Sequence, residues 1–213
     1  MELQLALDLL TPDQALELAG AAAPWFDLLE VGTPMVMAYG MEPVRLLRRA
    51  FPHKAILADL KIIDSSRAET CCALQAGADW VTVLAVAGDL TVRRTVEAAR
   101  ELGGRVMADL TAHPQPARRA QELIELGVDR VCVHTARDLV DQGADPWEEL
   151  EQVAALVAPR YLAVAGGISP QTVGQAARLG VGAAVVGGAV TRSPDPAAAA
   201  ALLWTAAGKG AEG

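Results

Sequence analysis

The chain has 213 residues, 52% of them hydrophobic, and a formal net charge of −8 at pH 7. The hydrophobic content excludes disorder over most of the chain, and the length is enough for one substantial core. The negative charge argues against a general nucleic-acid binder, so an anionic ligand would need local hydrogen-bond donors.

No apolar run approaches the roughly 20 residues of a membrane-spanning helix. The first residues, Met1–Gln4, lack the basic start and apolar stretch of a signal peptide. The three cysteines, Cys71, Cys72 and Cys132, show neither disulfide nor metal-ligand spacing, which favours buried reduced thiols. We therefore expect a cytoplasmic protein with no membrane or nucleic-acid partner.

Eight short apolar runs predict eight strands, and a segment with helical signals follows each of them. The strands are expected at residues 3–8, 28–31, 55–61, 80–84, 105–110, 130–134, 161–165 and 183–186. The helices are expected to begin near residues 11, 42, 66, 90, 116, 145, 169 and 195. Capping boxes are predicted at Thr11 and Ser66, while Ser169 and Asp195 each precede a proline that begins a helix.

Eight strand–helix repeats in a chain of this length predict an α/β fold, a (β/α)8 TIM barrel that forms one domain over residues 1–213. A glycine at the helix-to-strand joints, Gly77, Gly127 and Gly180, supports the count because it can end a helix in the left-handed conformation. A doubly wound open sheet is the alternative, but the even strand spacing and the lack of an early Gly-x-Gly-x-x-Gly motif favour the barrel. Residues 208–213 are expected to form a loose tail.

Polar residues lie at or near the carboxyl ends of five predicted strands. In a barrel these strand ends meet at one mouth, where active sites form. Each residue alone could cap a helix or make a structural hydrogen bond, but the whole set on one rim predicts an active site. The set is Asp8, Glu30, Asp59, Lys61, Asp109 and His134.

The segment Ala58–Asp64 is central to this prediction. Side chains alternate along a strand, so Asp59 and Lys61 should point to the same side, with Asp64 on the loop beyond. Opposite charges at the end of a buried strand are costly unless they pair or meet a ligand. Acid, base and acid at this spacing suggest an active site, and a strand-end ion pair followed by a capping acid is the structural alternative.

Two further features indicate what the site could bind. Glu30 and Asp59, on neighbouring strands, offer the hard oxygen ligands that suit Mg2+, with water and substrate completing its shell. Lys61 would add positive charge for a developing oxyanion such as an enediolate, and His134 could move a proton near neutral pH.

Glycine pairs follow the seventh and eighth strands, Gly166–Gly167 and Gly187–Gly188. Barrel enzymes commonly bind phosphate at these two loops on backbone N–H groups, although tight turns also use such pairs. The backbone donors would explain how an acidic protein binds an anion.

Several segments resemble one protein family. They are Gln4–Asp8, Glu30–Pro34, the Asp59-x-Lys61-x-x-Asp64 motif, Asp79–Val83, Val133–His134, Ala165–Gly167 and Val186–Gly188. Over nearly its whole length the chain is similar to the 3-hexulose-6-phosphate synthase and 3-keto-L-gulonate-6-phosphate decarboxylase group of the orotidine-monophosphate decarboxylase superfamily. The Asp-x-Lys-x-x-Asp motif in this context is highly specific to that superfamily.

The resemblance implies a homodimeric barrel with a shared active site. It implies that Glu30 and Asp59 hold Mg2+ and that Asp8 and Lys61 contact substrate oxygens. It further implies that Asp64 reaches into the partner subunit's site. Phosphate would lie on Gly166, Gly167, Gly187 and Gly188.

The two kinds of enzyme in this group differ in several residues at the mouth. Asp109, Ala165, Gly188 and the segment 145–150 resemble the synthase, whereas Arg137 resembles the decarboxylase. Two segments, Ser65–Arg67 and Thr111–Pro114, fit neither pattern, so a third sugar phosphate stays open.

The resemblance therefore implies a synthase that adds the 1,2-enediolate of D-ribulose 5-phosphate to formaldehyde, with Lys61, Asp64, Asp109 and His134 as its catalytic set. The alternative is decarboxylation of 3-keto-L-gulonate 6-phosphate, with Arg137 and His134 organising protonation. A barrel that binds a phosphosugar without turnover is the third possibility, and the complete acid–lysine–acid set counts against it.

Overall fold

Eight parallel strands close into a barrel in the computed structural model, which describes residues 1–8 and 11–209. Each strand pairs with the next in sequence, and β1 pairs with β8, so the sheet has no free edge. The strands are β1 Glu2–Leu7, β2 Leu28–Val31, β3 Ala55–Ile62, β4 Trp80–Leu84, β5 Arg105–Asp109, β6 Arg130–His134, β7 Leu162–Ala165 and β8 Ala183–Val186. The predicted (β/α)8 barrel is confirmed, and the open sheet is excluded.

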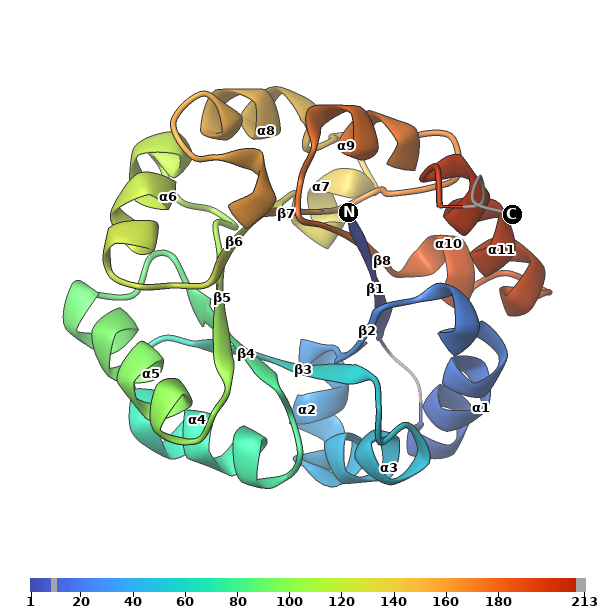
Figure 1. Cartoon of the computed structure of the whole chain (residues 1–213), viewed down its shortest axis with the longest axis horizontal. Helices are drawn as coiled ribbons and strands as arrows, with labels where there is room; N and C mark the ends of the chain where they lie inside the picture. Colours follow the sequence, from blue (N-terminus) through green and yellow to red (C-terminus); the bar gives the residue numbers. More distant parts are fainter. Residues whose placement is uncertain (9–10, 210–213) are drawn as a thin grey trace.

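Helices surround the barrel in a single ring (Figure 1). Eight of them match the expected positions: α1 Pro12–Ala22, α3 Glu42–Ala50, α4 Ser66–Gln75, α5 Asp89–Glu101, α6 Pro116–Glu125, α8 Trp147–Ala154, α9 Val173–Leu179 and α11 Pro196–Ala206. Short 3-10 helices cover Ala23–Trp25 and Pro159–Tyr161.

Three short helices were not expected from the sequence. They are α2 Thr33–Tyr39, α7 Arg137–Val140 and α10 Gly188–Thr191, and each follows the carboxyl end of a strand. One has seven residues and two have four, which is too short for a helical period to show in the sequence. These helices form part of the mouth, so they matter for the site.

The helix starts show which capping signals were correct. The capping box at Thr11 is confirmed, because its hydroxyl accepts the Gln14 N–H and the Gln14 side chain accepts the Thr11 N–H. Asp195 also caps α11, accepting the Ala198 N–H at 2.9 Å.

Two other predicted caps are wrong. Ser66 is the first residue of α4 and is buried, and Ser65 stands at the cap position without a side-chain hydrogen bond. Ser169 starts a turn closed by the Thr172 hydroxyl, so α9 begins only at Val173. The helix begins one residue earlier than expected at α4 and three residues later at α9, and cap spacing alone does not reveal either difference.

The core has two layers, one between the strands and the helices and one inside the barrel. The inner layer is built from one face of the strands and includes Leu28, Leu57, Met107 and Cys132. Trp80 belongs to the same layer and lies between the guanidinium groups of Arg105 and Arg130, at 5.3 and 5.0 Å from its ring. Because side chains fill the interior, ligands can approach the barrel only from its ends.

The cysteines only partly follow expectation. All three are free thiols, and Cys132 is buried inside the barrel, where burial raises the pKa of its thiol. Cys71 is half-buried and Cys72 exposed on α4, so the expectation of burial is wrong for both. The buried residues of α4 are Ser66, Thr70 and Ala73, so neither cysteine lies among those that face the core.

The end of the described chain contacts the barrel's amino-terminal side. Lys209 donates to the Asp27 carboxylate, and its ammonium lies 4.3 Å from the centre of the Trp204 ring. The rest of the expected tail, residues 210–213, lies outside the described residues. Across the described ranges, no helix has both the length and the apolar character needed to cross a bilayer.

Candidate active site

The charged residues expected at the mouth do come together there. The ammonium of Lys61, from β3, contacts the Asp59 carboxylate and lies 3.4 Å from Asp109 Oδ2. The same Asp109 oxygen lies 2.9 Å from Nδ1 of His134, at the end of β6. Asp59 and Asp109 are only 6% and 4% exposed, so this chain of charges is largely removed from water.

Asp59 is fixed by two hydroxyl groups as well as by Lys61. Thr33, at the start of α2, donates to Asp59 Oδ2 at 2.6 Å, and Thr82 of β4 donates to Oδ1 at the same distance. Three donors on one carboxylate leave it little freedom to rotate. Sequence analysis placed Asp59 correctly but missed both hydroxyl partners.

Lys61 stays ammonium although it is largely buried. Burial alone would lower its pKa, but the carboxylates of Asp59 and Asp109 raise the pKa above the ordinary lysine value. Its backbone is unusual, with φ of 48°, a left-handed conformation that costs a residue with a Cβ roughly 1–2 kcal/mol. The prediction that Asp59 and Lys61 face one side is confirmed, but the strand is not regular at this point.

Asp109 and His134 form a hydrogen-bonded pair. Burial opposes ionisation of Asp109, but the bond to His134 and the charge of Lys61 hold the pKa of the carboxyl well below its usual range. Thr111 completes the pair by donating both its N–H and its hydroxyl to Asp109 Oδ1, at 2.8 and 2.6 Å. Since Nδ1 of His134 is engaged, Nε2 is the ring nitrogen left to exchange a proton.

The pKa of His134 is raised even though the ring is largely buried. Burial lowers it, but the hydrogen bond and the charge of Asp109 outweigh burial. The Asp109 carboxylate therefore favours the protonated ring, and histidine is the side chain best suited to take and return a proton.

A second group of carboxylates lies on the other side of Asp59. Glu30 of β2 is buried, and its burial and the charges of Asp59 and Asp8 raise its pKa to about 8. Its one hydrogen-bonded oxygen accepts from Gln4 Nε2 at 2.6 Å. Asp8 also has a raised pKa, because of burial and then Asp59. Among the described residues, neither carboxylate makes an ion pair. Lys61 attracts both of them from a distance, and His134 and Arg137 also attract Asp8.

The carboxylates could hold one hard cation with help from a ligand. Within residues 1–8 and 11–209, no three His, Cys, Asp or Glu side chains are arranged to bind a metal alone. Mg2+ usually takes one or two protein carboxylates and completes its shell with water and substrate oxygens. Glu30 and Asp59 fit that pattern, because two repelling, buried carboxylates would be relieved by a divalent charge.

The Asp8 carboxylate packs directly against the backbone of Gly32. A Cβ on Gly32 would overlap the Asp8 carboxylate, and a Cβ on Gly187 would lie 3.7 Å from Asp8 Oδ2. Asp8 therefore lies against the backbone that follows β2 and β8. This explains the glycine in the Gly32–Thr33–Pro34 segment after β2.

The expected phosphate-binding end has free backbone donors. The N–H groups of Gly166, Gly167 and Gly187 donate no backbone hydrogen bond in the described part of the chain. Gly166 has φ of 99°, and a Cβ there would lie 2.7 Å from the Thr135 carbonyl oxygen, so only glycine fits. These loops after β7 and β8 present donors and no carboxylate of their own.

One cation at this end was missed by sequence analysis. A side chain on Gly188 would collide with the guanidinium of Arg192, which folds back over that glycine from the end of α10. Arg192 makes no ion pair with any described residue and is exposed. A basic residue four positions after a glycine pair was the available signal, but the short helix that brings the two together was not predicted.

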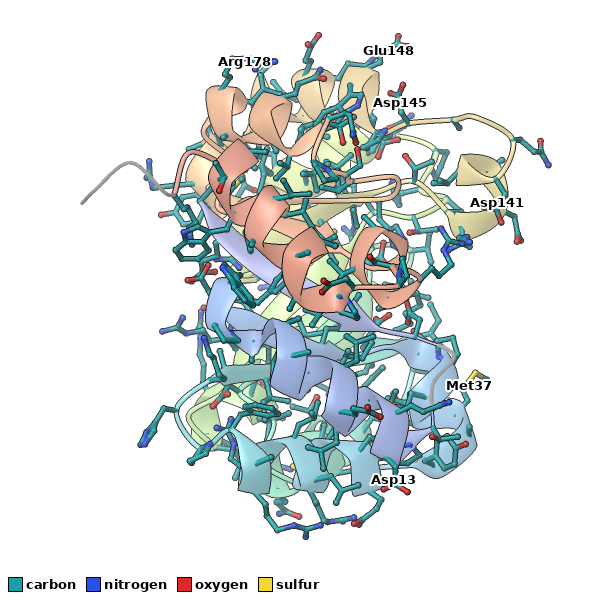
Figure 2. All side chains as sticks on the ribbon, turned by 90° about the vertical axis from the view of Figure 1, so that its right-hand side faces the viewer. Asp13, Met37, Asp141, Asp145, Glu148 and Arg178 are labelled. Carbon is teal, nitrogen blue, oxygen red and sulfur yellow. The ribbon has the colours of Figure 1, made fainter. Side chains whose placement is uncertain are left out.

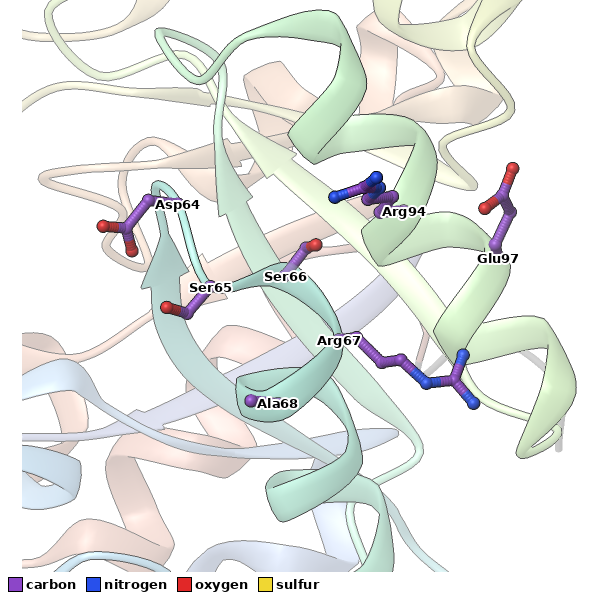
Figure 3. Close-up of a pocket in the computed structure, with 7 residues that line it drawn as sticks. All are labelled: Asp64, Ser65, Ser66, Arg67, Ala68, Arg94 and Glu97. Carbon is purple, nitrogen blue, oxygen red and sulfur yellow. The ribbon is translucent and has the colours of Figure 1, made fainter.

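Two predicted site residues do not join the others in this chain. Asp64 is exposed on the loop after β3, where it lines a shallow pocket of about 440 Å3 between α4 and α5, and its carboxylate points away from α5 (Figure 3). No described contact links it to Lys61. Arg137 starts α7 and donates to Asp141 at 3.1 and 3.2 Å instead of contacting His134. Asp141 lies at the mouth end of the molecule (Figure 2).

The closed barrel and its mouth define a (β/α)8 protein with an acid–lysine–histidine site at the carboxyl ends of its strands. A family model described as Orotidine 5'-phosphate decarboxylase / HUMPS family matches residues 1–203. The chain belongs to this family.

Individual relatives support membership of this family. The chain is 40% identical to 3-hexulose-6-phosphate synthase 3 of Staphylococcus saprophyticus over 200 residues, which cover 94% of this chain and 95% of the relative. A 3-hexulose-6-phosphate synthase structure from Salmonella typhimurium matches with a TM-score of 0.94 and 37% identity, over 97% of this chain and 98% of that one. A 3-keto-L-gulonate-6-phosphate decarboxylase structure from Vibrio cholerae matches with a TM-score of 0.85 and 27% identity, over 98% and 97%.

Replacing Glu30 by Gln is expected to stabilise the metal-free protein as pH rises. The pKa of Glu30 is about 8 in the folded chain and near 4.5 when unfolded. The folded state therefore binds more protons in this window, and the wild type loses stability from about pH 5 to pH 8. The Glu30→Gln variant cannot ionise at this position. Its free energy of unfolding should therefore exceed that of the wild type by an amount that grows across the window to a few kcal/mol.

Urea unfolding in the presence of EDTA, from pH 4.5 to pH 9, measures this gain. Glu17→Gln, at an exposed position on α1, is the matched control and should show no pH-dependent gain. A stability difference for Glu30→Gln that is the same at pH 5 and pH 8 would contradict the electrostatic account of this carboxyl.

Proposed function

We propose that this chain is a Mg2+-dependent 3-hexulose-6-phosphate synthase, which joins D-ribulose 5-phosphate to formaldehyde. The main support is the Lys61–Asp109–His134 chain of contacts, which sets a cation beside a proton carrier at the barrel mouth. The synthase relatives match over nearly the whole chain, and Asp109 and Ala165 are the residues that resemble that activity.

The reaction needs a proton to leave C1 of the pentulose phosphate, giving a 1,2-enediolate. His134 Nε2 takes this proton, because Asp109 fixes the ring through Nδ1. The Lys61 ammonium stabilises the negative oxygen, and Asp8 accepts a hydrogen bond from a substrate hydroxyl. The enediolate carbon then forms a bond to the formaldehyde carbon, and the new alkoxide takes a proton from His134.

Mg2+ held by Glu30 and Asp59 would supply Lewis-acid polarisation of the substrate oxygens. The residues fit this ion by the chemistry of their oxygens and by their mutual repulsion. The free N–H groups of the loops after β7 and β8 would bind the phosphate at the opposite side of the mouth, together with the guanidinium of Arg192.

Purified protein should form hexulose phosphate from D-ribulose 5-phosphate and formaldehyde when Mg2+ is present. EDTA should abolish the product, and Lys61→Ala should lower kcat by about 100-fold or more, because it removes the charge that stabilises the oxyanion. No product at micromolar enzyme would exclude the synthase. Faster CO2 release from 3-keto-L-gulonate 6-phosphate would select the decarboxylase instead.

A panel of pentulose and hexulose phosphates tests the remaining alternatives. Exchange of solvent deuterium at the acidic carbon reports enediolate formation without requiring the second substrate. A ligand that raises the melting temperature without any exchange in the presence of Mg2+ would favour a barrel that binds phosphosugars without turnover.

Arg192→Ala should raise KM for D-ribulose 5-phosphate about tenfold with little change in kcat, since a charge-assisted hydrogen bond to phosphate is lost far from the reacting carbon. Arg178→Ala is the matched control. That arginine is also exposed and packs near a helical glycine, Gly174, but it lies on α9 away from the mouth (Figure 2). Equal KM values for both variants would exclude a phosphate contact by Arg192.

We further propose that the protein is a homodimer with a shared active site. Asp64 lies outside its own chain's charged set, and several apolar side chains on segments that follow β2, β3 and β4 are exposed. Ile63 and Val86 are each 47% exposed, Leu90 is 62% exposed, and Met37 on α2 is 83% exposed at the mouth end (Figure 2). A second copy would cover these side chains and bring Asp64 to the partner's site.

Mixing two inactive variants tests the shared site. If Asp64→Asn and Lys61→Ala exchange subunits at random, half of the dimers are mixed, and each has one site with both lesions and one with neither. Activity should then return to about a quarter of wild type. Exchange proven by mass spectrometry without any recovery would place Asp64 within its own chain's site.

A further inference from the structure

The ladder between β3 and β4 is interrupted beside the active site. Leu57 and Ala58 pair in register with Trp80 and Val81, and pairing resumes only at Ile62 with Val83. Four steps along β3, from 58 to 62, therefore face two steps along β4, from 81 to 83. The extra backbone carries Asp59 and Lys61, and Thr82 alone stands opposite it.

A single hydroxyl group spans this gap. Thr82 Oγ1 donates to Asp59 Oδ1 at 2.6 Å and accepts the Lys61 N–H at 2.8 Å. Thr82 is 4% exposed, so water does not readily replace either bond. The N–H it accepts belongs to the residue with the left-handed φ of 48°. One side-chain atom thus holds the carboxylate through its proton and the lysine backbone through its lone pair.

We propose that Thr82 is the positioning residue of the Asp59–Lys61 pair. Among the uncharged side chains of this size, only a hydroxyl both donates and accepts at the same atom, which is what this gap requires. Without it, a buried N–H loses its acceptor and the strained backbone at Lys61 loses its restraint. The ammonium would then leave the position from which it stabilises an oxyanion.

A positioning role for Thr82 predicts kinetic effects that the loss of an ordinary buried threonine would not cause. The phosphate-binding donors lie across the mouth on the loops after β7 and β8, so loss of Thr82 should leave substrate binding nearly intact. It should instead lower kcat and weaken the cation site, because Asp59 belongs to both. These kinetic consequences rest on the proposed synthase function, but the positions of Asp59 and Lys61 do not.

The test compares Thr82→Val, which keeps the shape and removes the hydroxyl, with Thr82→Ser, which keeps the hydroxyl. Thr95→Val is the matched control, because Thr95 is fully buried and its hydroxyl makes one bond, to the Thr91 carbonyl within α5, at 2.9 Å. We expect Thr82→Val to lower kcat 10- to 100-fold and to leave KM almost unchanged. It should also weaken the binding of Mn2+, the probe of the cation site, about tenfold. Thr82→Ser should remain within about threefold of wild type on all three measures.

Crystal structures of wild type and Thr82→Val make the test independent of activity. We expect the variant to lose the left-handed φ at Lys61 or the contact between Lys61 and Asp59. An unchanged Lys61 backbone with the contact intact would overturn the proposal, as would Thr82→Val and Thr95→Val behaving alike in kcat and Mn2+ binding. If the wild type itself lacks synthase activity, the proposed function fails, while the two structures still decide the role of Thr82.

Discussion

The contact of the half-buried Lys61 ammonium with two carboxylates is the interaction on which the mouth of the barrel depends. The ammonium lies between two carboxylates, Asp59 and Asp109, that are almost fully withdrawn from water. Removing one charge from such a set leaves the others uncompensated in a medium of low dielectric, which is far more costly than losing a surface ion pair. The hydroxyl groups of Thr33, Thr82 and Thr111 satisfy the remaining carboxylate oxygens.

This arrangement divides the mouth into two electrostatic halves. On one side, Lys61 and His134 balance Asp59 and Asp109. On the other side, Glu30 adds a buried carboxyl that stays protonated up to about pH 8 in the metal-free chain. In the proposed reaction, the first half moves protons and stabilises an anion, and the second half holds a cation. Because these groups lie on strand ends, loops around the mouth could change without moving them.

Sequence analysis predicted the barrel because each strand–helix repeat carries its own local signals. The apolar runs, the helix stops and the acids at strand ends all agree with one architecture. The set Asp8, Glu30, Asp59, Lys61, Asp109 and His134 followed, since topology alone brings strand ends together. What could not be predicted depends on contacts across the fold or on very short elements.

Thr82 shows this limit clearly. Its place in an apolar strand is visible in the sequence, but its partners depend on a register shift in β3 that no period-2 pattern reveals. Arg192 shows it too, because the four residues of α10 carry no helical period, yet they fold its guanidinium over Gly188. Conversely, Asp64 and Arg137 fit a motif but lie apart from the charged chain in a single subunit.

Gly32 has a consequence for charge as well as for shape. Any side chain there would occupy the space of the Asp8 carboxylate and would displace it from the backbone after β2. Asp8 already raises the pKa of Glu30, so its position helps to set how readily that carboxyl ionises. A single hydrogen atom in place of a methyl group at residue 32 thus adjusts the protonation of a residue on another part of the rim. On the proposed function, a position that carries no charge thereby helps to set how readily Glu30 becomes a metal ligand.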